Sequence, residues 1–266
     1  YQNLMNTKFT VFGHKGFLGK NIVAHLKKNN LKYYLPPRNK HTFKKNLGNI
    51  IYCIGTDDVF KDPLKSLDAN LRILCEVIEK NNFNSFMFIS STRVYLGSNN
   101  TREIDGVIIN PNNSTYQFNI LKLASENLCL SKKNKKIKVV RLSNLYGKFF
   151  KNQIYLLPTI LRDSKKKKKI LININKNSKK NYLNVNDAIP LIFKIIKKSK
   201  FRIYNIASDK LYSIKFILDN IKNKFSFRVI YKNQHVRFDE SKINIDRIKK
   251  EFNFKPIDKF KDFLNS

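Results

Sequence analysis

The sequence predicts a doubly wound parallel α/β sheet, because short apolar strand segments alternate with stretches of helical periodicity. A second observation supports this fold class. The first apolar segment runs into a glycine-rich turn and then into a helical pattern, a typical opening for such a sheet. With 266 residues, of which 42% are hydrophobic, the chain can also bury a sizeable core.

The expected elements alternate in type along the chain. Strands are predicted, from apolar runs, at 9–12, 32–35, 50–54, 86–90, 137–142 and 203–206. Helices are predicted, from apolar residues three and four positions apart, at 20–28, 66–80 and 116–131. Helices between strands are the usual crossover connections of a parallel sheet.

The glycine-rich turn at residues 13–19 reads Gly-His-Lys-Gly-Phe-Leu-Gly. Glycines at this spacing let the backbone approach a pyrophosphate, and the N–H groups at a helix N-terminus attract its charge. The residues expected to contact such a cofactor are Gly13, Lys15, Gly16, Phe17, Leu18 and Gly19. A tight turn without a ligand would also explain the glycines, and Lys15 could simply face solvent.

Two further segments carry chemistry. Residues 89–95 read Ile-Ser-Ser-Thr-Arg-Val-Tyr, and residues 118–122 read Phe-Asn-Ile-Leu-Lys. Together they resemble the active site of the extended short-chain dehydrogenase/reductase superfamily, the sugar-nucleotide epimerases, dehydratases and reductases, which pairs Ser or Thr with Tyr-x-x-x-Lys. Phe118 stands where that Tyr belongs. A Tyr there would share a helix face with Lys122, whose ammonium would favour the phenolate.

Other motifs of this superfamily follow in the expected order, so the resemblance covers nearly the whole chain. The matching segments are 141–147, 180–187, 204–208 and 245–256. The resemblance implies a Rossmann-type sheet with a smaller, discontinuous C-terminal substrate-binding lobe. It implies the following division: residues 1–147 as the NAD(P)-binding domain, 181–208 completing its sheet, and 148–180 with 209–266 as the lobe.

The resemblance also implies roles for single residues. Ser91 would position the substrate oxygen, and Lys122 would act as ribose ligand and electrostatic partner. The residues expected to contact substrate are Ser91, Arg93, Asn144, Lys180 and, as the weakest candidate, Arg237. Purely structural roles stay open for two of them, since Ser91 could cap local backbone at a strand end and Lys122 could be a solvated helix lysine.

Phe118 bears directly on activity. Loss of a general acid/base typically lowers a rate by about 10²–10⁴-fold, so the resemblance implies attenuated catalysis. Tyr116 is a possible substitute acid. It lies two residues earlier, a rotation of about 200° on a helix, and would point away from Lys122 unless the helix begins later than expected.

The cofactor preference follows from an absence in the sequence. No Asp or Glu occurs between Gly13 and Asp57, although an NAD site normally places an acidic residue about 20 residues beyond the glycines. Arg38 could instead pair with a 2′-phosphate, which favours NADP over NAD, or it could be an ordinary surface arginine. Gly55 would permit close approach of the cofactor.

Composition sets further bounds. The net charge is +34, but lysine is spread along the whole chain, so a specific nucleic-acid partner is not expected. No apolar run reaches membrane-spanning length and no signal peptide begins the sequence, which predicts a cytoplasmic protein without membrane insertion. Three cysteines have no metal-like spacing and are expected to be reduced core residues: Cys53, Cys75 and Cys129.

The resemblance therefore implies an NAD(P)-dependent epimerase, dehydratase or reductase of surface-polysaccharide biosynthesis that acts on a nucleotide sugar. It also implies a homodimer formed through helices 66–80 and 116–131. Two alternatives stay open. One is a catalytically silent relative that binds cofactor or sugar nucleotide as a regulatory or partner protein. The other, supported only by charge, is a nucleic-acid-associated protein.

Overall fold

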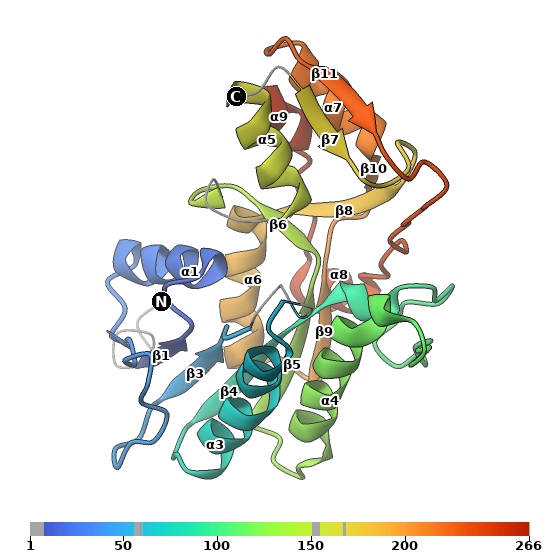
Figure 1. Ribbon diagram of the computed structural model, residues 1–266. Helices are drawn as coiled ribbons and strands as arrows, with labels where there is room; N and C mark the ends of the chain where they lie inside the picture. The colour runs from blue at the N-terminus through green and yellow to red at the C-terminus, as the bar shows by residue number, and fades with distance from the viewer. Residues whose placement is uncertain (1–7, 56–58, 60, 151–154, 167–168, 266) are drawn as a thin grey trace.

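A six-stranded parallel sheet forms the centre of the molecule, in the order β2-β1-β3-β4-β5-β9 (Figure 1). The computed structural model describes residues 8–55, 59, 61–150, 155–166 and 169–265. The strand bounds are β1 Phe9–Phe12, β2 Tyr33–Tyr34, β3 Asn49–Tyr52, β4 Ser85–Ser91, β5 Ile137–Leu142 and β9 Ile203–Ile206. Each of these strands coincides with a predicted one, and the predicted doubly wound sheet is confirmed.

Helices cover both faces of this sheet (Figure 1). On one face lie α1 (Phe17–Lys28) and α6 (Val185–Lys198), and on the other lie α3 (Ile73–Glu79) and α4 (Gln117–Ser131). Successive side chains of each strand point to opposite faces of the sheet and so enter different cores. On β4, Met87 packs with α6, whereas the residues directly before and after it in sequence pack with α3 and α4. This two-sided burial explains why most residues of these strands are apolar.

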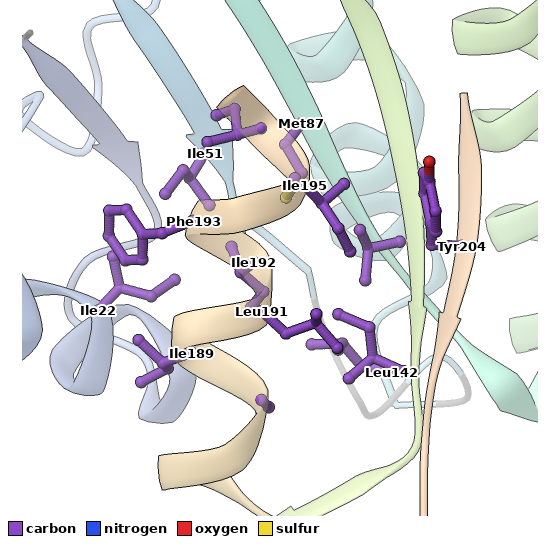
Figure 2. Packing of buried hydrophobic residues seen from close by; sticks show 14 of the residues in the cluster. Ile22, Ile51, Met87, Leu142, Ile189, Leu191, Ile192, Phe193, Ile195 and Tyr204 are labelled. Carbon is purple, nitrogen blue, oxygen red and sulfur yellow. The ribbon is translucent and has the colours of Figure 1, made fainter. Parts of the chain in front are cut away.

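Helix α6 packs its apolar face against the sheet (Figure 2). Its side chains at three- and four-residue spacing pack against α1 and strands β3, β4, β5 and β9. The helix begins where the Asn184 side chain accepts a hydrogen bond from Asn186 N at 2.9 Å. The α6 residues that Figure 2 labels in this contact are Ile189, Leu191, Ile192, Phe193 and Ile195.

The single helix predicted at 66–80 is wrong in detail. The chain instead forms α2 (Pro63–Leu67), a π-helical turn (Asp68–Arg72) and then α3. Buried polar groups satisfy the widened turn, because Tyr52 donates to Ala69 O at 2.7 Å and Asn70 Nδ2 donates to Ser66 O at 2.8 Å. Single π-helical turns inside helices are common at functional sites.

A smaller lobe lies beyond the carboxyl ends of the sheet strands (Figure 1). One of its sheets joins β6 (Asn144–Tyr146), β8 (Lys179–Asn184) and β10 (Leu211–Ser213), and the other joins β7 (Lys169–Ile172) and β11 (Arg228–Tyr231). They share a separate apolar core with α5 (Leu156–Lys166), α7 (Ile214–Lys222) and α9 (Phe260–Asn265). The segment that includes α8 (Asp246–Phe252) returns to the large core, where Ile248 is buried.

The cysteines differ from one another in burial. Cys129 is fully buried, whereas Cys53 and Cys75 are only partly buried, so the prediction of three core cysteines is correct for one of them. None of the three forms a disulfide with another described residue. Within the described ranges, no helix has both the length and the apolar character needed to cross a membrane.

Candidate active site

A cavity of about 470 Å³ opens at the carboxyl ends of β3, β4 and β5. In parallel α/β sheets this edge is where ligands bind, because the connections there leave a crevice. Both lobes contribute to the walls. The large lobe supplies the glycine turn, the residues after β3, β4 and β5, and one face of α4, while the smaller lobe supplies residues near α5, β8 and the irregular segment 232–245.

The glycine turn forms one end of the cavity through backbone contacts that exclude side chains. Gly13 has φ +79°, and a Cβ there would lie 2.7 Å from the carbonyl carbon of Cys53. A Cβ on Gly19 would lie 2.3 Å from the Gly13 carbonyl oxygen. Helix α1 starts here without a side-chain cap and without an acidic residue in its first turn. The turn therefore offers close backbone approach and uncapped N–H groups to an anion.

The other end contains the three residues expected to be catalytic positions. Ser91 ends β4, and its Oγ accepts a hydrogen bond from Arg93 N at 3.2 Å. Lys122 is buried, and its Nζ donates to Ile89 O at 3.3 Å. The same Nζ lies 5.8 Å from the centre of the Phe118 ring. The expected shared face of residues 118 and 122 is therefore present, with an aromatic ring in place of a phenol beside the ammonium.

Two tyrosines near this end do not reach the cavity. Tyr116 belongs to a 3₁₀ turn that precedes α4, and its hydroxyl lies 2.9 Å from where a Cβ on Gly97 would be. Tyr95 is fully buried and donates to Asn205 Oδ1 at 3.0 Å. The structure thus places neither hydroxyl beside Lys122, and the position of Tyr116 argues against its role as a substitute acid.

Buried side chains fix α4 against the strands that carry the site. Glu126 of α4 forms an ion pair with Arg141 of β5 at 2.6 Å, and it accepts a hydrogen bond from the Ser90 hydroxyl of β4. Arg141 also donates to the Tyr95 hydroxyl. The Glu126 and Arg141 side chains are only 3% and 7% exposed, so this pair is a buried link between α4, which carries Lys122, and β5. The Ser90 hydroxyl extends the link to β4, the strand of Ser91.

Arg93 occupies the middle of the cavity wall. Its guanidinium carbon lies 5.3 Å from the centre of the Phe118 ring and 5.5 Å from that of Phe238. One terminal nitrogen donates to Thr115 O at 3.1 Å. Burial lowers the pKa of Arg93, and the charge of Glu240 acts in the opposite direction. The guanidinium is therefore a largely desolvated cation held against two aromatic rings.

A compact polar cluster forms the wall on the side of the smaller lobe. Glu240 accepts hydrogen bonds from Asn144 Nδ2 at 2.9 Å and from Asn181 N at 2.8 Å. Lys180 Nζ lies 3.3 Å from the same carboxylate and 3.7 Å from the centre of the Phe238 ring. Burial lowers the pKa of Lys180, against the influence of Glu240. The expected phosphate ligand is thus already paired with an acid.

Most of the predicted site residues meet at this cavity. Those that line it are Gly16, Phe17, Leu18, Gly19, Gly55, Ser91, Arg93, Phe118, Lys122, Asn144 and Lys180. Gly13 shapes the turn from behind. The structure does not bring four others to the lining: Lys15, Arg38, Tyr116 and Arg237. Arg237 lies instead at the surface, in an ion pair with Asp239 at 2.7 Å.

Several lining residues were not predicted from the sequence. Ser143 follows β5 directly, so the rule that ligands bind at the carboxyl ends of parallel strands could have found it. Phe238 and Glu240 come from an irregular segment without any periodic pattern, and no local signal places them at the cavity. Cys53 also lines it, and burial raises the pKa of its thiol to about 12, which keeps it protonated.

Several buried polar atoms fit a polar cofactor. Among the described residues, Ser143 Oγ, Asn70 Oδ1 and Arg93 Nε are buried without a hydrogen-bond partner. The Asn70 oxygen lies 4.0 Å, and Lys122 Nζ 3.5 Å, from the point where a Cβ on Gly55 would be. The open position at Gly55 therefore has a donor, the Lys122 ammonium, and an acceptor, the Asn70 oxygen, close to it. A donor and an acceptor at this spacing suit the hydroxyls of a ribose.

Comparison with solved structures supports the fold over the whole chain. RMD from Pseudomonas aeruginosa, complexed with NADPH, is 18% identical with a TM-score of 0.78, and the match covers 97% of each chain. UDP-glucuronic acid 4-epimerase from Bacillus cereus, in complex with UDP-glucuronic acid and NAD, is 16% identical with a TM-score of 0.80, covering 97% of this chain and 96% of that one.

A mutant of the Bacillus cereus epimerase is also similar. It carries a tyrosine-to-phenylalanine substitution and was solved in complex with UDP-4-deoxy-4-fluoro-glucuronic acid and NAD. The TM-score is 0.76 at 16% identity, with 97% of each chain covered. No curated protein sequence matches the chain.

A family model gives the assignment. The model described as the NAD dependent epimerase/dehydratase family matches residues 50–207, which is more than half of the chain. The matched region includes Ser91 at the end of β4, Lys122 of α4 and the motif that follows β5. The chain therefore belongs to the NAD-dependent epimerase/dehydratase family.

Proposed function

We propose that the protein binds a nicotinamide dinucleotide and a nucleotide sugar in this cavity and transfers hydride between them at an attenuated rate. One observation carries the proposal. A single cavity joins the glycine turn, Ser91 and Lys122, with Phe118 at the position of the acid. The turn suits a diphosphate, and the side chains at the other end suit a sugar hydroxyl that changes oxidation state.

The position of each residue along the cavity indicates which part of the cofactor or substrate it would contact. The glycine turn and the start of α1 would hold the cofactor diphosphate, while Lys122 and Asn70 would hold its ribose beside Gly55. When bound, the nicotinamide supplies or accepts a hydride. Ser91 would donate a hydrogen bond to the sugar oxygen, and the Lys122 ammonium would stabilise negative charge that develops there. Asn144 and Lys180 would contact the substrate diphosphate.

Phe118 limits what these residues can do. A phenyl ring can neither give nor take a proton, so the sugar hydroxyl has to exchange its proton with water or with another group. The absence of a general acid/base at this position typically lowers a rate by about 10²–10⁴-fold. The phenylalanine mutant of the Bacillus cereus epimerase in complex with NAD and a substrate analogue supports the view that binding tolerates such a ring.

The same observation favours a second candidate function. A family member with Phe118 could bind cofactor or sugar nucleotide without turnover and act as a regulatory or partner protein. The two candidates share every binding contact, and they differ only in whether the native chain turns over.

Finer features of the proposal rest on the resemblance. We infer a role in surface-polysaccharide biosynthesis, in the cytoplasm where nucleotide sugars are supplied, and a preference for NADP through Arg38. We also infer a homodimer through the helices at 63–79 and 117–131. Exposed apolar side chains on these helices support the last inference, because Leu64 is 78%, Leu67 46% and Ile120 39% exposed.

The test compares the native chain with Phe118→Tyr. Each is incubated with NAD⁺ or NADP⁺ and a panel of UDP-, dTDP- and GDP-linked sugars, and the reduced nicotinamide is followed by its absorbance in single turnover. We expect slow reduction in the native chain and a rate roughly 10²-fold or more higher with tyrosine. Turnover only in Phe118→Tyr would favour the silent relative. Absence of cofactor binding, measured by nicotinamide fluorescence at moderate salt, would contradict the enzyme. Failure to bind any nucleotide sugar as well would also contradict the silent relative.

A further inference from the structure

Arg93 carries a charge for which the described residues provide no counter-ion. No carboxylate of the described residues forms an ion pair with Arg93. Its Nε is buried and has no hydrogen-bond partner among the described residues, while Nη2 donates to the backbone carbonyl of Thr115. A desolvated cation without an anion is unfavourable, so the arrangement is suited to a ligand that brings the negative charge.

Glu240 does not fill this role. Its two oxygens accept hydrogen bonds from Asn144 Nδ2 and Asn181 N and lie beside Lys180 Nζ. This carboxylate is therefore satisfied by the smaller lobe, although its charge still reaches Arg93. The two cations of the cavity wall differ in consequence, because Lys180 has a fixed anion and Arg93 has none among the described residues.

The position of Arg93 indicates which part of a nucleotide sugar it meets. The Arg93 guanidinium and the Lys122 ammonium both lie against the Phe118 ring, at 5.3 and 5.8 Å from its centre. Arg93 also follows Ser91 by two residues, on the 3₁₀ turn Thr92–Tyr95 that ends β4. Arg93 is therefore next to the end of the cavity that contains Ser91, Phe118 and Lys122, here called the reacting end, where the sugar ring would lie. Lys180 and Asn144 lie on the side of the smaller lobe.

We infer that Arg93 binds a carboxylate on the reacting sugar, so that the substrates are nucleotide-linked uronic acids. This inference rests on the proposed function. A planar guanidinium held against Phe118 and Phe238 can present its two terminal nitrogens as a pair of parallel donors, which matches a carboxylate and no neutral sugar substituent. Hydroxymethyl groups would leave the cation unpaired.

The test measures dissociation constants by calorimetry, at one salt concentration and with saturating reduced cofactor. Two matched pairs serve as probes: UDP-glucuronate with UDP-glucose, and GDP-mannuronate with GDP-mannose. We expect the native chain to bind the uronate of at least one pair roughly tenfold more tightly than its neutral partner. Arg93→Gln should bring that ratio close to one. Arg93→Lys, which keeps the charge without the paired donors, should give an intermediate ratio.

Arg228→Gln is the control for the large net charge, because Arg228 is exposed on β11 and its replacement removes the same charge away from the cavity. This variant should keep the native ratio. Equal affinities within both pairs, or a preference that survives Arg93→Gln, would overturn the inference while leaving the proposed function in place. If none of the four nucleotides binds, the proposed function fails and the inference falls with it. Should Arg93→Gln not fold, the ratio in Arg93→Lys decides, and an unchanged ratio there overturns the inference.

Discussion

The two ends of the cavity differ in the kind of atoms that determine their geometry, which are backbone atoms at one end and side chains at the other. At the glycine turn the contacts are between backbone atoms, and the space beside Gly19 is too small for even one added methyl group. At the end that contains Ser91, Phe118 and Lys122 the geometry depends on those side chains and on the buried Glu126–Arg141 pair, which links α4 to β5. One end is defined by what it excludes, and the other by the chemical groups it presents.

We propose that this difference lets Phe118 take the place of the tyrosine in the motif that the chain resembles. Replacing tyrosine by phenylalanine removes a hydroxyl and keeps the ring, so Phe118 still contacts the Arg93 and Lys122 cations and the local packing is preserved. A comparable change at Gly19 would displace backbone. We therefore expect the packing around Phe118 to tolerate the loss of a hydroxyl group, whereas the packing at Gly19 would not tolerate an added methyl group.

The largest effect is expected from Glu126→Gln, which tests whether side chains hold the reacting end. The substitution leaves the buried Arg141 cation without its anion, and breaking such a pair typically costs about 3–5 kcal/mol. We expect the melting temperature to fall by roughly 10 °C. Glu79→Gln is the matched control, because it removes a pair with Lys132 in which the Glu79 side chain is 50% exposed, worth at most about 1 kcal/mol. An equal fall in melting temperature in the two variants would show that the buried pair does not stabilise this part of the protein more than an exposed pair does.

Gly19→Ala tests the cofactor end. The new Cβ would lie 2.3 Å from a backbone oxygen, so the turn must open, and overpacking of this kind costs about 1–3 kcal/mol. We expect the affinity for reduced nicotinamide dinucleotide, measured by fluorescence titration, to fall roughly tenfold or more. At Gly106 nothing lies within 4 Å of an added Cβ, so Gly106→Ala should bind as the native chain does. Unchanged affinity in a folded Gly19→Ala would mean that the cofactor does not bind at this turn.

The same contrast accounts for what the sequence could predict. The central strands and the glycine turn are local patterns, since the alternation at Met87 or the spacing of Gly13, Gly16 and Gly19 can be recognised within a few residues. The register of residues 118 and 122 is equally local, and the structure has it as expected.

The smaller lobe and its part of the cavity depend on contacts between distant segments. Strand β8 pairs with β6 and with β10, and Glu240 reaches Asn144 across almost a hundred positions of sequence. No periodic pattern in residues 232–245 indicates that contact. The π-helical turn was missed for a related reason, because the Tyr52 hydroxyl that satisfies Ala69 comes from a strand.

A smaller effect is expected at the edge of the cofactor end. Arg38 is exposed after β2 and does not line the cavity, so any contact with a 2′-phosphate would be made in partly solvated surroundings. We expect Arg38→Gln to weaken NADPH binding by about fivefold to tenfold and to leave NADH binding unchanged, because only NADPH carries the phosphate. Lys32→Gln, before β2, removes the same charge and should change neither affinity. Equal losses for both cofactors would assign Arg38 to general attraction by charge.

The smallest effect is expected for Tyr116→Phe, and it decides where the proton goes at the reacting end. Tyr116 points toward Gly97 and does not line the cavity, whereas Tyr155 does. We therefore expect the single-turnover rate of Tyr116→Phe to stay within about twofold of the native rate, in the native chain and in Phe118→Tyr alike. Had Tyr116 replaced the missing acid, its loss would lower the native rate by about 10²–10⁴-fold and leave the Phe118→Tyr rate intact. The single-turnover rate of Tyr155→Phe, measured in the same experiment, tests whether the Tyr155 phenol on the cavity wall supplies the proton. If both variants keep the native rate, neither of these two phenols supplies the proton, which is the result that we expect if the sugar hydroxyl exchanges its proton with solvent beside Phe118.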